Sequence, residues 1–261
     1  MSSLGRWTEA ARRLLDHLEK TQMENLETAA SWCASTIGSG GLVHLFGSGH
    51  SRIPVEEMFP RYGSFPGFHP MVELSMTNHT AVIGSNGQRQ AMFIERTEGL
   101  AEVILSNFEF GPDDLMIVFS ASGRSAVPIE MALGAREREM AVIAVTSMAE
   151  SEVAPATHSS GKRLFEVADL TIDIGTPAGD AMVFVDGLET PVGPGSTLAN
   201  AAVVNEIKVR TAELLTRAGS PPWVLSASSV VGEERSEELF RFAYAEHGRR
   251  LARLLDHTHR L

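Results

Sequence analysis

The sequence contains very little cysteine and no long apolar run. Cys33 is the only cysteine among the 261 residues, so no disulfide can form within the chain, and a reducing compartment is expected. No apolar run approaches the roughly 18 residues that a membrane-spanning helix needs. Residues 1–6 lack the apolar stretch of a secretory signal peptide. These absences predict a soluble, cytoplasmic protein that has no membrane partner.

Basic residues are also in deficit. The chain has 22 Lys and Arg against 33 Asp and Glu, which gives a formal net charge of −11. Because nucleic-acid binding needs a basic face, we expect no nucleic-acid partner. Hydrophobic residues make up 43% of the chain and charged residues 21%, which excludes a disordered polypeptide and fits a globular protein.

Both ends of the chain show helical periodicity. Apolar residues recur at helical spacing from Trp7 to Ile37, and only Gln22 interrupts them. This pattern predicts one long amphipathic helix that ends at the glycines of residues 38–41. A helix of about 30 residues would be some 45 Å long, so part of it is expected to contact another subunit. A second amphipathic helix is predicted over residues 234–256.

Between these ends, short apolar runs alternate with helical stretches. Such runs suit parallel strands that are buried on both faces. We therefore predict an α/β fold with three layers, in which helices flank a five-stranded, mainly parallel sheet. The predicted strands cover residues 42–46, 115–119, 141–145 and 170–174, with a weaker candidate at 71–75, and the predicted helices cover 97–108, 126–138 and 197–217.

The chain is expected to form a single domain over residues 1–261, because no internal repeat or linker divides it. Its core is expected at about residues 38–218, with helical extensions at 4–37 and 234–256. The Asp186-Gly187 pair predicts a hairpin turn between residues 181–185 and 188–192.

Two loops that follow predicted strands combine glycines with serines. Such a loop offers backbone N–H groups and hydroxyls, and a helix that begins after it adds the positive end of its dipole. This arrangement suits a phosphate or another oxyanion, and the alternative is a tight turn with a serine cap. The candidate binding residues are Gly47, Ser48, Gly49 and Ser51 in the first loop and Ser120, Ser122, Gly123, Arg124 and Ser125 in the second.

Neither loop has the pattern of a nucleotide site. The dinucleotide pattern G-x-G-x-x-G needs a glycine where Arg52 stands, and no G-x-x-x-x-G-K-[ST] run is present. The loops resemble instead those of the sugar isomerase (SIS) domain family, whose second loop has the form S-x-S-G-x-S, as in residues 120–125. The resemblance covers roughly residues 5–220 and is strongest for the phosphoheptose-isomerase-like branch.

This resemblance implies a doubly wound, flavodoxin-like fold that binds a sugar phosphate. The serine loop would hold the phosphate, and Ser196 and Thr197, at the start of a later helix, are further candidate binding residues. In the family the pocket lies between protomers, which implies at least a homodimer. We expect no cofactor.

A pair of glutamates follows the first loop. Aldose–ketose isomerisation moves a proton between C2 and C1 through an enediolate and needs a base and an acid. Residues 55–62 resemble the E-E-x-x-x-R-Y run of phosphoheptose isomerases, and this resemblance places the base at Glu57. Because the run follows the loop about one turn sooner than in the family, Glu56 is the alternative. Pro54 suits the first position of a helix that would carry both.

The acid is less well defined. The family uses a histidine on the last core helix, and residues 197–217 contain none. His79 is our first substitute, His50 the second and Glu206 the third. His44, His50, His69 and His79 do not pair at the i, i+4 spacing of a helical zinc motif, so we expect no metal, and His44 is interpreted as a core residue.

These residues predict a sugar-phosphate aldose–ketose isomerase, in which Glu57→Gln should abolish turnover but spare ligand binding. Two alternatives keep the fold. One is an etherase that removes lactate from an amino-sugar phosphate by elimination, and the other is a sugar-phosphate-sensing module without catalysis. Since the serine loop binds an oxyanion rather than phosphorus itself, a sulfonated sugar is a further alternative.

Overall fold

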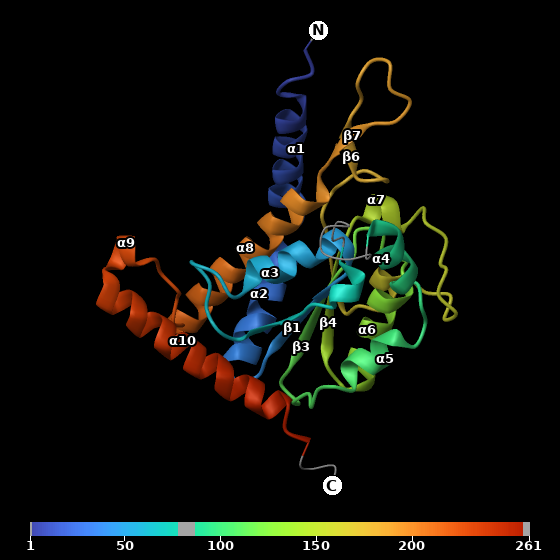
Figure 1. Ribbon diagram of the computed structural model, residues 1–261. Helices are drawn as coiled ribbons and strands as arrows, with labels where there is room; N and C mark the ends of the chain where they lie inside the picture. The colour runs from blue at the N-terminus through green and yellow to red at the C-terminus, as the bar shows by residue number, and fades with distance from the viewer. Residues whose placement is uncertain (1, 78–86, 258–261) are drawn as a thin grey trace.

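A five-stranded parallel sheet lies at the centre of the molecule (Figure 1). The computed structural model describes residues 2–77 and 87–257. Within them the strand order is β2-β1-β3-β4-β5, and each neighbouring pair is parallel, which confirms the predicted α/β fold. The strands are β1 (Val43–Gly47), β2 (Phe68–Met71), β3 (Leu115–Phe119), β4 (Ala141–Thr146) and β5 (Leu170–Asp173).

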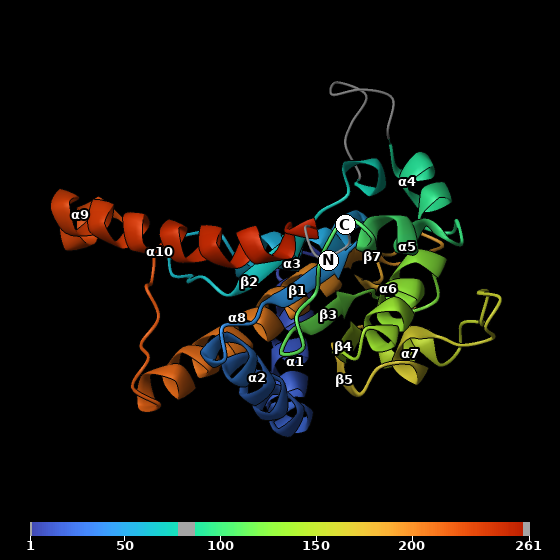
Figure 2. The ribbon, with the colours of Figure 1, turned by 90° about the horizontal axis from the view of Figure 1, so that it is seen from below.

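Helices cover both faces of the sheet (Figure 2). Leu115, Ile117 and Phe119 of β3 point into one hydrophobic cluster, whereas Met116 and Val118 point into the other, because alternate residues of a strand face opposite sides. All of these side chains are buried, as expected for a parallel sheet between two helical layers. The helices α2 (Met23–Gly38) and α8 (Ser196–Arg217) cover one face, and α5 (Leu100–Leu105) and α6 (Ala126–Glu137) cover the other. Helix α1 (Arg6–Thr21) packs against α8 and projects beyond the sheet (Figure 1).

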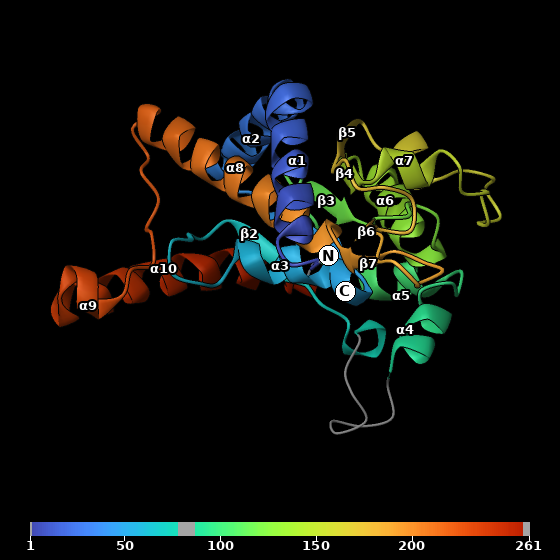
Figure 3. The same cartoon turned by 90° about the horizontal axis from the view of Figure 1, so that it is seen from above.

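Shorter elements lie between the main strands and helices. They are the 3-10 turns η1 (Gly49–Arg52), η2 (Leu74–Met76) and η3 (Leu164–Glu166) and the helices α3 (Ile53–Met58), α4 (Gln88–Ile94), α7 (Met148–Ser151) and α9 (Ser228–Val231). Helix α3 has Pro54 in its first turn, as predicted. The last helix, α10 (Glu233–Leu254), extends with α9 beyond the body of the molecule (Figure 3).

The N-terminal region forms two helices, so the prediction of one helix over residues 7–37 is wrong. Helix α1 ends at Thr21 and α2 begins at Met23, with Gln22 between them. The Gln22 side chain is buried, and its Oε1 accepts a hydrogen bond from the Asp173 N–H at 3.1 Å. Because a buried amide needs such partners, the chain bends toward the end of β5 at the one residue that interrupts the apolar stripe.

Two smaller predictions have different outcomes. The hairpin is present, but its predicted strand bounds are wrong: β6 (Ala181–Val183) pairs antiparallel with β7 (Val192–Pro194) instead of with residues 188–191. The turn at Asp186-Gly187 does form, because the Leu188 N–H donates to the Val185 carbonyl, but it lies within a longer connection. The weak strand at 71–75 is wrong beyond its first residue, because β2 lies at Phe68–Met71 and pairs there with β1. Its later residues turn outward, and Leu74 is exposed.

The amino ends of the strands hold a buried polar network. His44 Nδ1 lies 2.9 Å from His69 Nδ1, and His44 Nε2 lies 3.2 Å from Asp114 Oδ2. Asp114 Oδ1 accepts hydrogen bonds from the Leu42 N–H and from Arg253 Nη2, both at 2.7 Å. This network ties the end of α10 to the sheet, and it confirms His44 as a core residue. Across the described residues, no helix is both long enough and apolar enough to cross a bilayer.

Candidate functional site

A polar cavity of about 200 Å³ lies at the carboxyl ends of β1, β3 and β4. Both predicted loops contribute to it, as expected for ligand sites of open parallel sheets. The groove described below is larger, but this cavity contains the serine hydroxyls of both loops. Its lining residues are Ser48, Gly49, His50, Ser51, Gln88, Ala91, Met92, Glu95, Ser120, Ala121, Ser122, Ser125 and Glu150.

The first loop is compact because its glycine allows close backbone contact. A Cβ atom on Gly47 would lie 2.1 Å from the Ser51 carbonyl oxygen, so no larger residue fits without moving the loop. The Ser51 N–H donates to the Ser48 carbonyl at 3.0 Å. The turn therefore brings Ser48 and Ser51 to the same wall of the cavity.

The second loop is held by its own hydroxyl groups. Gly123 adopts a left-handed φ of 60° and donates its N–H to Ser120 Oγ at 3.2 Å. Ser151 Oγ donates to the Ser122 carbonyl at 3.0 Å, which fixes the loop against α7. Helix α6 begins directly after Ser125, whose side chain does not cap it. The loop thus presents hydroxyls beside a helix N-terminus.

Glu95, at the end of α4, joins the two loops and was not predicted from the sequence. Its carboxylate accepts hydrogen bonds from Ser48 Oγ at 2.7 Å and from Ser125 Oγ at 3.0 Å. Its backbone carbonyl accepts the Val127 N–H at 3.0 Å, in the first turn of α6. Both oxygens of this carboxylate therefore engage hydroxyls that were assigned to phosphate binding.

Glu150, on α7, is a second carboxylate of the cavity that the sequence analysis missed. Burial raises the pKa of Glu150, the hydrogen bond from the Gly179 N–H opposes this rise, and the negative charge of Asp180 adds to it. The net effect is a raised pKa, so a protonated fraction persists closer to neutral pH than for an ordinary glutamate. A carboxyl group of this kind can donate a proton.

Five predicted binding residues are not among those that line the cavity: Gly47 and Gly123 lie within the two loops, and three others lie elsewhere. Among the described residues, the lining of the cavity includes neither Arg124 nor Ser196 nor Thr197. Arg124 lines an adjacent cavity of about 190 Å³, which shares Ser125 with the first. Ser196 donates its hydroxyl to Asp180 Oδ2 at 2.6 Å, and its N–H donates to Asp180 Oδ1 at 2.7 Å. The start of α8 therefore already holds a carboxylate.

Glu56 and Glu57 line a separate groove of about 480 Å³ between α3 and α10. Glu57 Oε1 accepts from Asn205 Nδ2 at 3.0 Å, and Glu57 Oε2 forms an ion pair with Arg61. Burial raises the pKa of Glu57, but the hydrogen bonds from Asn205 and Arg61 outweigh it and lower this pKa overall. Within one chain, the predicted base and the serine loops thus line different hollows.

The predicted candidates for the general acid also lie in different parts of the chain's structure or outside the described residues. His50 lines the cavity and Glu206 is exposed on α8, whereas His79 lies outside the described residues. His44 and His69 contact each other in the core. The described cavity therefore combines two carboxylates, His50 and hydroxyl donors from both loops.

Comparisons with known proteins identify close relatives in sequence. Residues 6–147 match the SIS domain. A UPF0309 protein of Geobacillus kaustophilus is 32% identical over 238 residues, which cover 90% of this chain and 92% of that protein. A UPF0309 protein of Oceanobacillus iheyensis is 33% identical over 227 residues, which cover 87% of this chain and 90% of that protein.

Two solved structures share the fold at low sequence identity. A phosphoheptose isomerase from Francisella tularensis matches with a TM-score of 0.51 and 17% identity, over 81% of this chain and 98% of that chain. The Vibrio vulnificus NanR protein, solved in complex with ManNAc-6P, matches with a TM-score of 0.52 and 14% identity, over 94% of this chain and 69% of that chain. The sequence match and the shared fold confirm the expected resemblance, and the chain belongs to the SIS domain family.

Proposed function

We propose that the chain is a sugar-phosphate aldose–ketose isomerase, and that the cavity at the carboxyl ends of β1 and β3 is its active site. The observation that carries this proposal is the Glu95 carboxylate, which joins hydroxyls of both serine loops inside the cavity. A carboxylate beside a cluster of neutral donors supplies a base and an oxyanion site in one place.

Neutral donors bind the phosphate in this proposal. Ser120, Ser122 and Ser125 line the cavity, and the N–H groups of the first turn of α6 lie next to them. The described lining residues include no Lys or Arg. Hydroxyls and the positive end of the α6 dipole would therefore bind the ligand's charge.

Glu95 and an incoming phosphate compete for the same hydroxyls. Ser48 Oγ and Ser125 Oγ both donate to Glu95 in the structure. A phosphate that takes over these donors frees the carboxylate, and a carboxylate that loses hydrogen bonds becomes a stronger base. Ligand binding thus prepares Glu95 to take the proton from C2 of an aldose. The proton then returns to C1 of the enediolate.

Glu150 is the proposed carrier of the proton that moves between the oxygens of C1 and C2. Its raised pKa supports this role, because the group must be protonated for part of the cycle. His50 lines the same cavity and is the alternative acid. Glu57 is the competing base, since the pocket lies between protomers in the family that its run resembles.

An etherase is the second candidate function. The cavity pairs two carboxylates, Glu95 and Glu150, where an isomerase of the resembled branch pairs a carboxylate with a histidine. In an elimination, one carboxylate would take the proton next to the carbonyl, and the other would protonate the departing lactate oxygen.

The test is solvent exchange followed by NMR. The protein is incubated in D2O with a panel of sugar phosphates, sulfonated sugars and muramic acid 6-phosphate, and the C1 and C2 proton signals are recorded. Deuterium at C1 or C2 of one compound, with interconversion of aldose and ketose, supports the isomerase. Lactate release identifies the etherase, and binding without exchange or release contradicts both and leaves the sensor.

We further propose that the protein is a cytoplasmic homodimer or larger oligomer. The α10 helix extends away from the body and carries the exposed Tyr244, which lines the groove with Phe240 and Tyr62. A second copy would cover this apolar surface. Sedimentation velocity at micromolar concentration tests the proposal, and a stable monomer would contradict it.

A further inference from the structure

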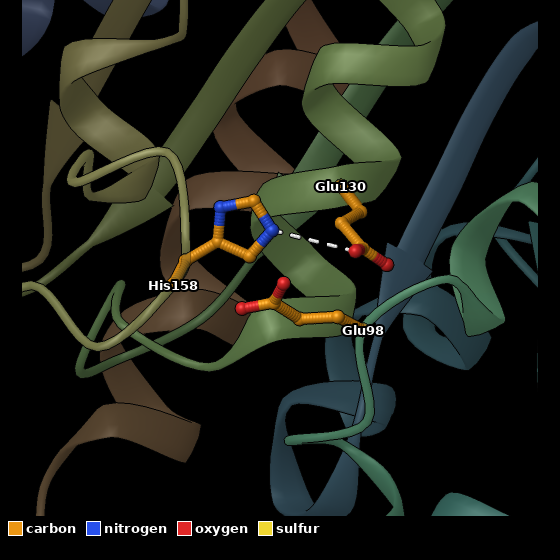
Figure 4. Close-up of side chains that lie close together, drawn as sticks. All are labelled: Glu98, Glu130 and His158. Atoms are coloured by element: carbon orange, nitrogen blue, oxygen red, sulfur yellow. Dashed lines mark hydrogen bonds and ion pairs between the residues drawn. The ribbon is translucent and has the colours of Figure 1, made fainter.

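Glu98, Glu130 and His158 converge on one point outside the cavity described above (Figure 4). Glu98 follows α4, Glu130 lies on α6 and His158 lies in the segment after α7. One ligand atom from each residue lies within 4.8 Å of the others. The His158 side chain is only 7% exposed and that of Glu130 is 18% exposed, although Glu98 is at the surface.

Each side chain in this cluster is oriented by a hydrogen-bond partner outside the cluster. Glu98 Oε1 accepts the Ser159 N–H at 2.8 Å, and the Glu130 carboxylate accepts the Gly99 N–H at 2.8 and 2.9 Å. His158 Nδ1 lies 2.7 Å from Ser160 Oγ, which leaves Nε2 directed at Glu130 Oε1, 3.3 Å away. Outer contacts of this kind orient the ligands of protein metal sites.

The cluster lies near two basic residues, because Arg96 and Arg124 line one cavity together with Glu98. Among residues 2–77 and 87–257, neither Glu98 nor Glu130 forms an ion pair with a Lys or Arg. Two carboxylates therefore share a single imidazole, most of which is buried. An imidazole beside carboxylates is a ligand set that suits zinc and neighbouring transition metals.

We propose that Glu98, Glu130 and His158 form a binding site for a divalent cation of the zinc type, with water completing the coordination. A tetrahedral ion about 2.1 Å from each ligand holds the ligand atoms roughly 3.4 Å apart. The ligand atoms, now within 4.8 Å of one another, would close by up to about 1.4 Å, by rotation of the exposed Glu98. This site is independent of the proposed sugar chemistry.

Its position gives the cation a structural role beside the serine loop. Thr157 Oγ1 donates to the Arg124 carbonyl at 2.9 Å, so the segment with His158 already contacts this loop. Glu98 lies three residues after Glu95. An ion bound here would therefore tie the segment of Glu95, helix α6 and the 157–160 segment together, and stabilise the folded protein by mass action.

The test is metal binding by the full-length, tag-free protein after removal of metals by a chelator. Zn²⁺ is titrated by calorimetry, and Co²⁺ is added separately as a probe with visible absorption. Glu98→Gln is the main variant, because it keeps the oxygen that accepts the Ser159 N–H and lies at the surface. His158→Ala removes the imidazole. The matched control is His257→Ala, at another His–Glu pair, where His257 Nδ1 lies 2.9 Å from Glu109 Oε1.

We expect one Zn²⁺ per chain, visible Co²⁺ bands that Zn²⁺ removes, and a higher melting temperature with Zn²⁺. Glu98→Gln and His158→Ala should each weaken Zn²⁺ binding at least ~10-fold, because even the loss of a residue that only orients a metal ligand lowers metal affinity by about that factor. His257→Ala should bind like the wild type. Absence of Zn²⁺ binding, or equal binding by all four proteins, would overturn the site and leave the cluster as a hydrogen-bonded tether.

Discussion

The two ends of the central sheet hold titratable groups in opposite ways. At the amino ends, His44, His69 and Asp114 contact one another and are buried among aromatic rings. At the carboxyl ends, Glu95 and Glu150 line a cavity, and the partners of Glu95 are hydroxyls that a ligand can take over. The first arrangement stabilises the fold, and the second allows chemistry. Changes at the two ends should therefore separate stability from activity.

Of the substitutions considered, Glu95→Gln should cause the largest loss of turnover. Removal of a general base costs about 10²–10⁴-fold in turnover. Affinity for a phosphosugar should be retained or become tighter, because the charge that competes for Ser48 and Ser125 is gone. The rate of proton exchange gives the turnover and calorimetry gives the affinity. Turnover near the wild-type rate would remove Glu95 from the mechanism.

Ser125→Ala tests the phosphate-binding part of the cavity at the carboxyl ends. A hydrogen bond to a charged group contributes about 1.5–3 kcal/mol, so the affinity for the phosphosugar should fall roughly 10- to 100-fold. Thr197→Ala is the control, because Thr197 lies outside the described lining of the cavity. Equal losses of affinity in the two variants would extend the site to the start of α8, as the sequence predicted.

The amino ends should control how stability depends on pH. Burial lowers the pKa of His44, and it lowers that of His69 to about 3. In an unfolded chain both titrate near 6.5. Between about pH 6.5 and pH 3 the unfolded chain therefore binds protons that the folded chain does not, and stability falls as the pH falls.

His69 should contribute up to about 1.4 kcal/mol of lost stability per pH unit in that range, and His44 should act in the same direction. Urea unfolding at about pH 7 and about pH 5.5 measures the loss. His69→Gln should reduce the difference between the two pH values without changing turnover. An unchanged difference would show that this network does not set the pH dependence.

Glu57→Gln should have the smallest effect on turnover and stability, although the family resemblance predicts that this change abolishes turnover. Glu57 is paired with Arg61 and lines the groove rather than the cavity. Partly exposed ion pairs contribute about 0–1 kcal/mol, so the free energy of unfolding should fall by no more than about 1 kcal/mol. Turnover should change only a few-fold. A loss of turnover as large as that of Glu95→Gln would mean that the groove of one protomer joins the cavity of another.

The sequence was sufficient for the sheet and the two loops. Parallel strands buried on both faces leave continuous apolar runs, and the loops contain the glycines that their turns require, such as Gly47. The bend at Gln22 had a signal, a polar residue in an apolar stripe, but its hydrogen bond to Asp173 depends on a strand 151 residues away.

The carboxylates of the cavity were harder to predict. Glu95 lies 47 residues after Ser48 and 30 before Ser125, at the end of a short helix. Its position depends on tertiary packing that no local pattern records. Glu150 had a usable signal, because it follows the end of β4, and the ends of all strands in such a sheet lie at the same edge. No pattern in the sequence indicated that Asp180 binds the start of α8.

Hydrogen–deuterium exchange by mass spectrometry tests the central claim most directly, namely that the cavity binds the phosphosugar. The wild-type protein is labelled with and without the panel compound that shows proton exchange, and with inorganic phosphate as a simpler probe. The account predicts slower amide exchange in residues 47–52 and 120–127 and no change in residues 56–62 and 240–244. Protection of the second pair of segments, with none in the first, would contradict it.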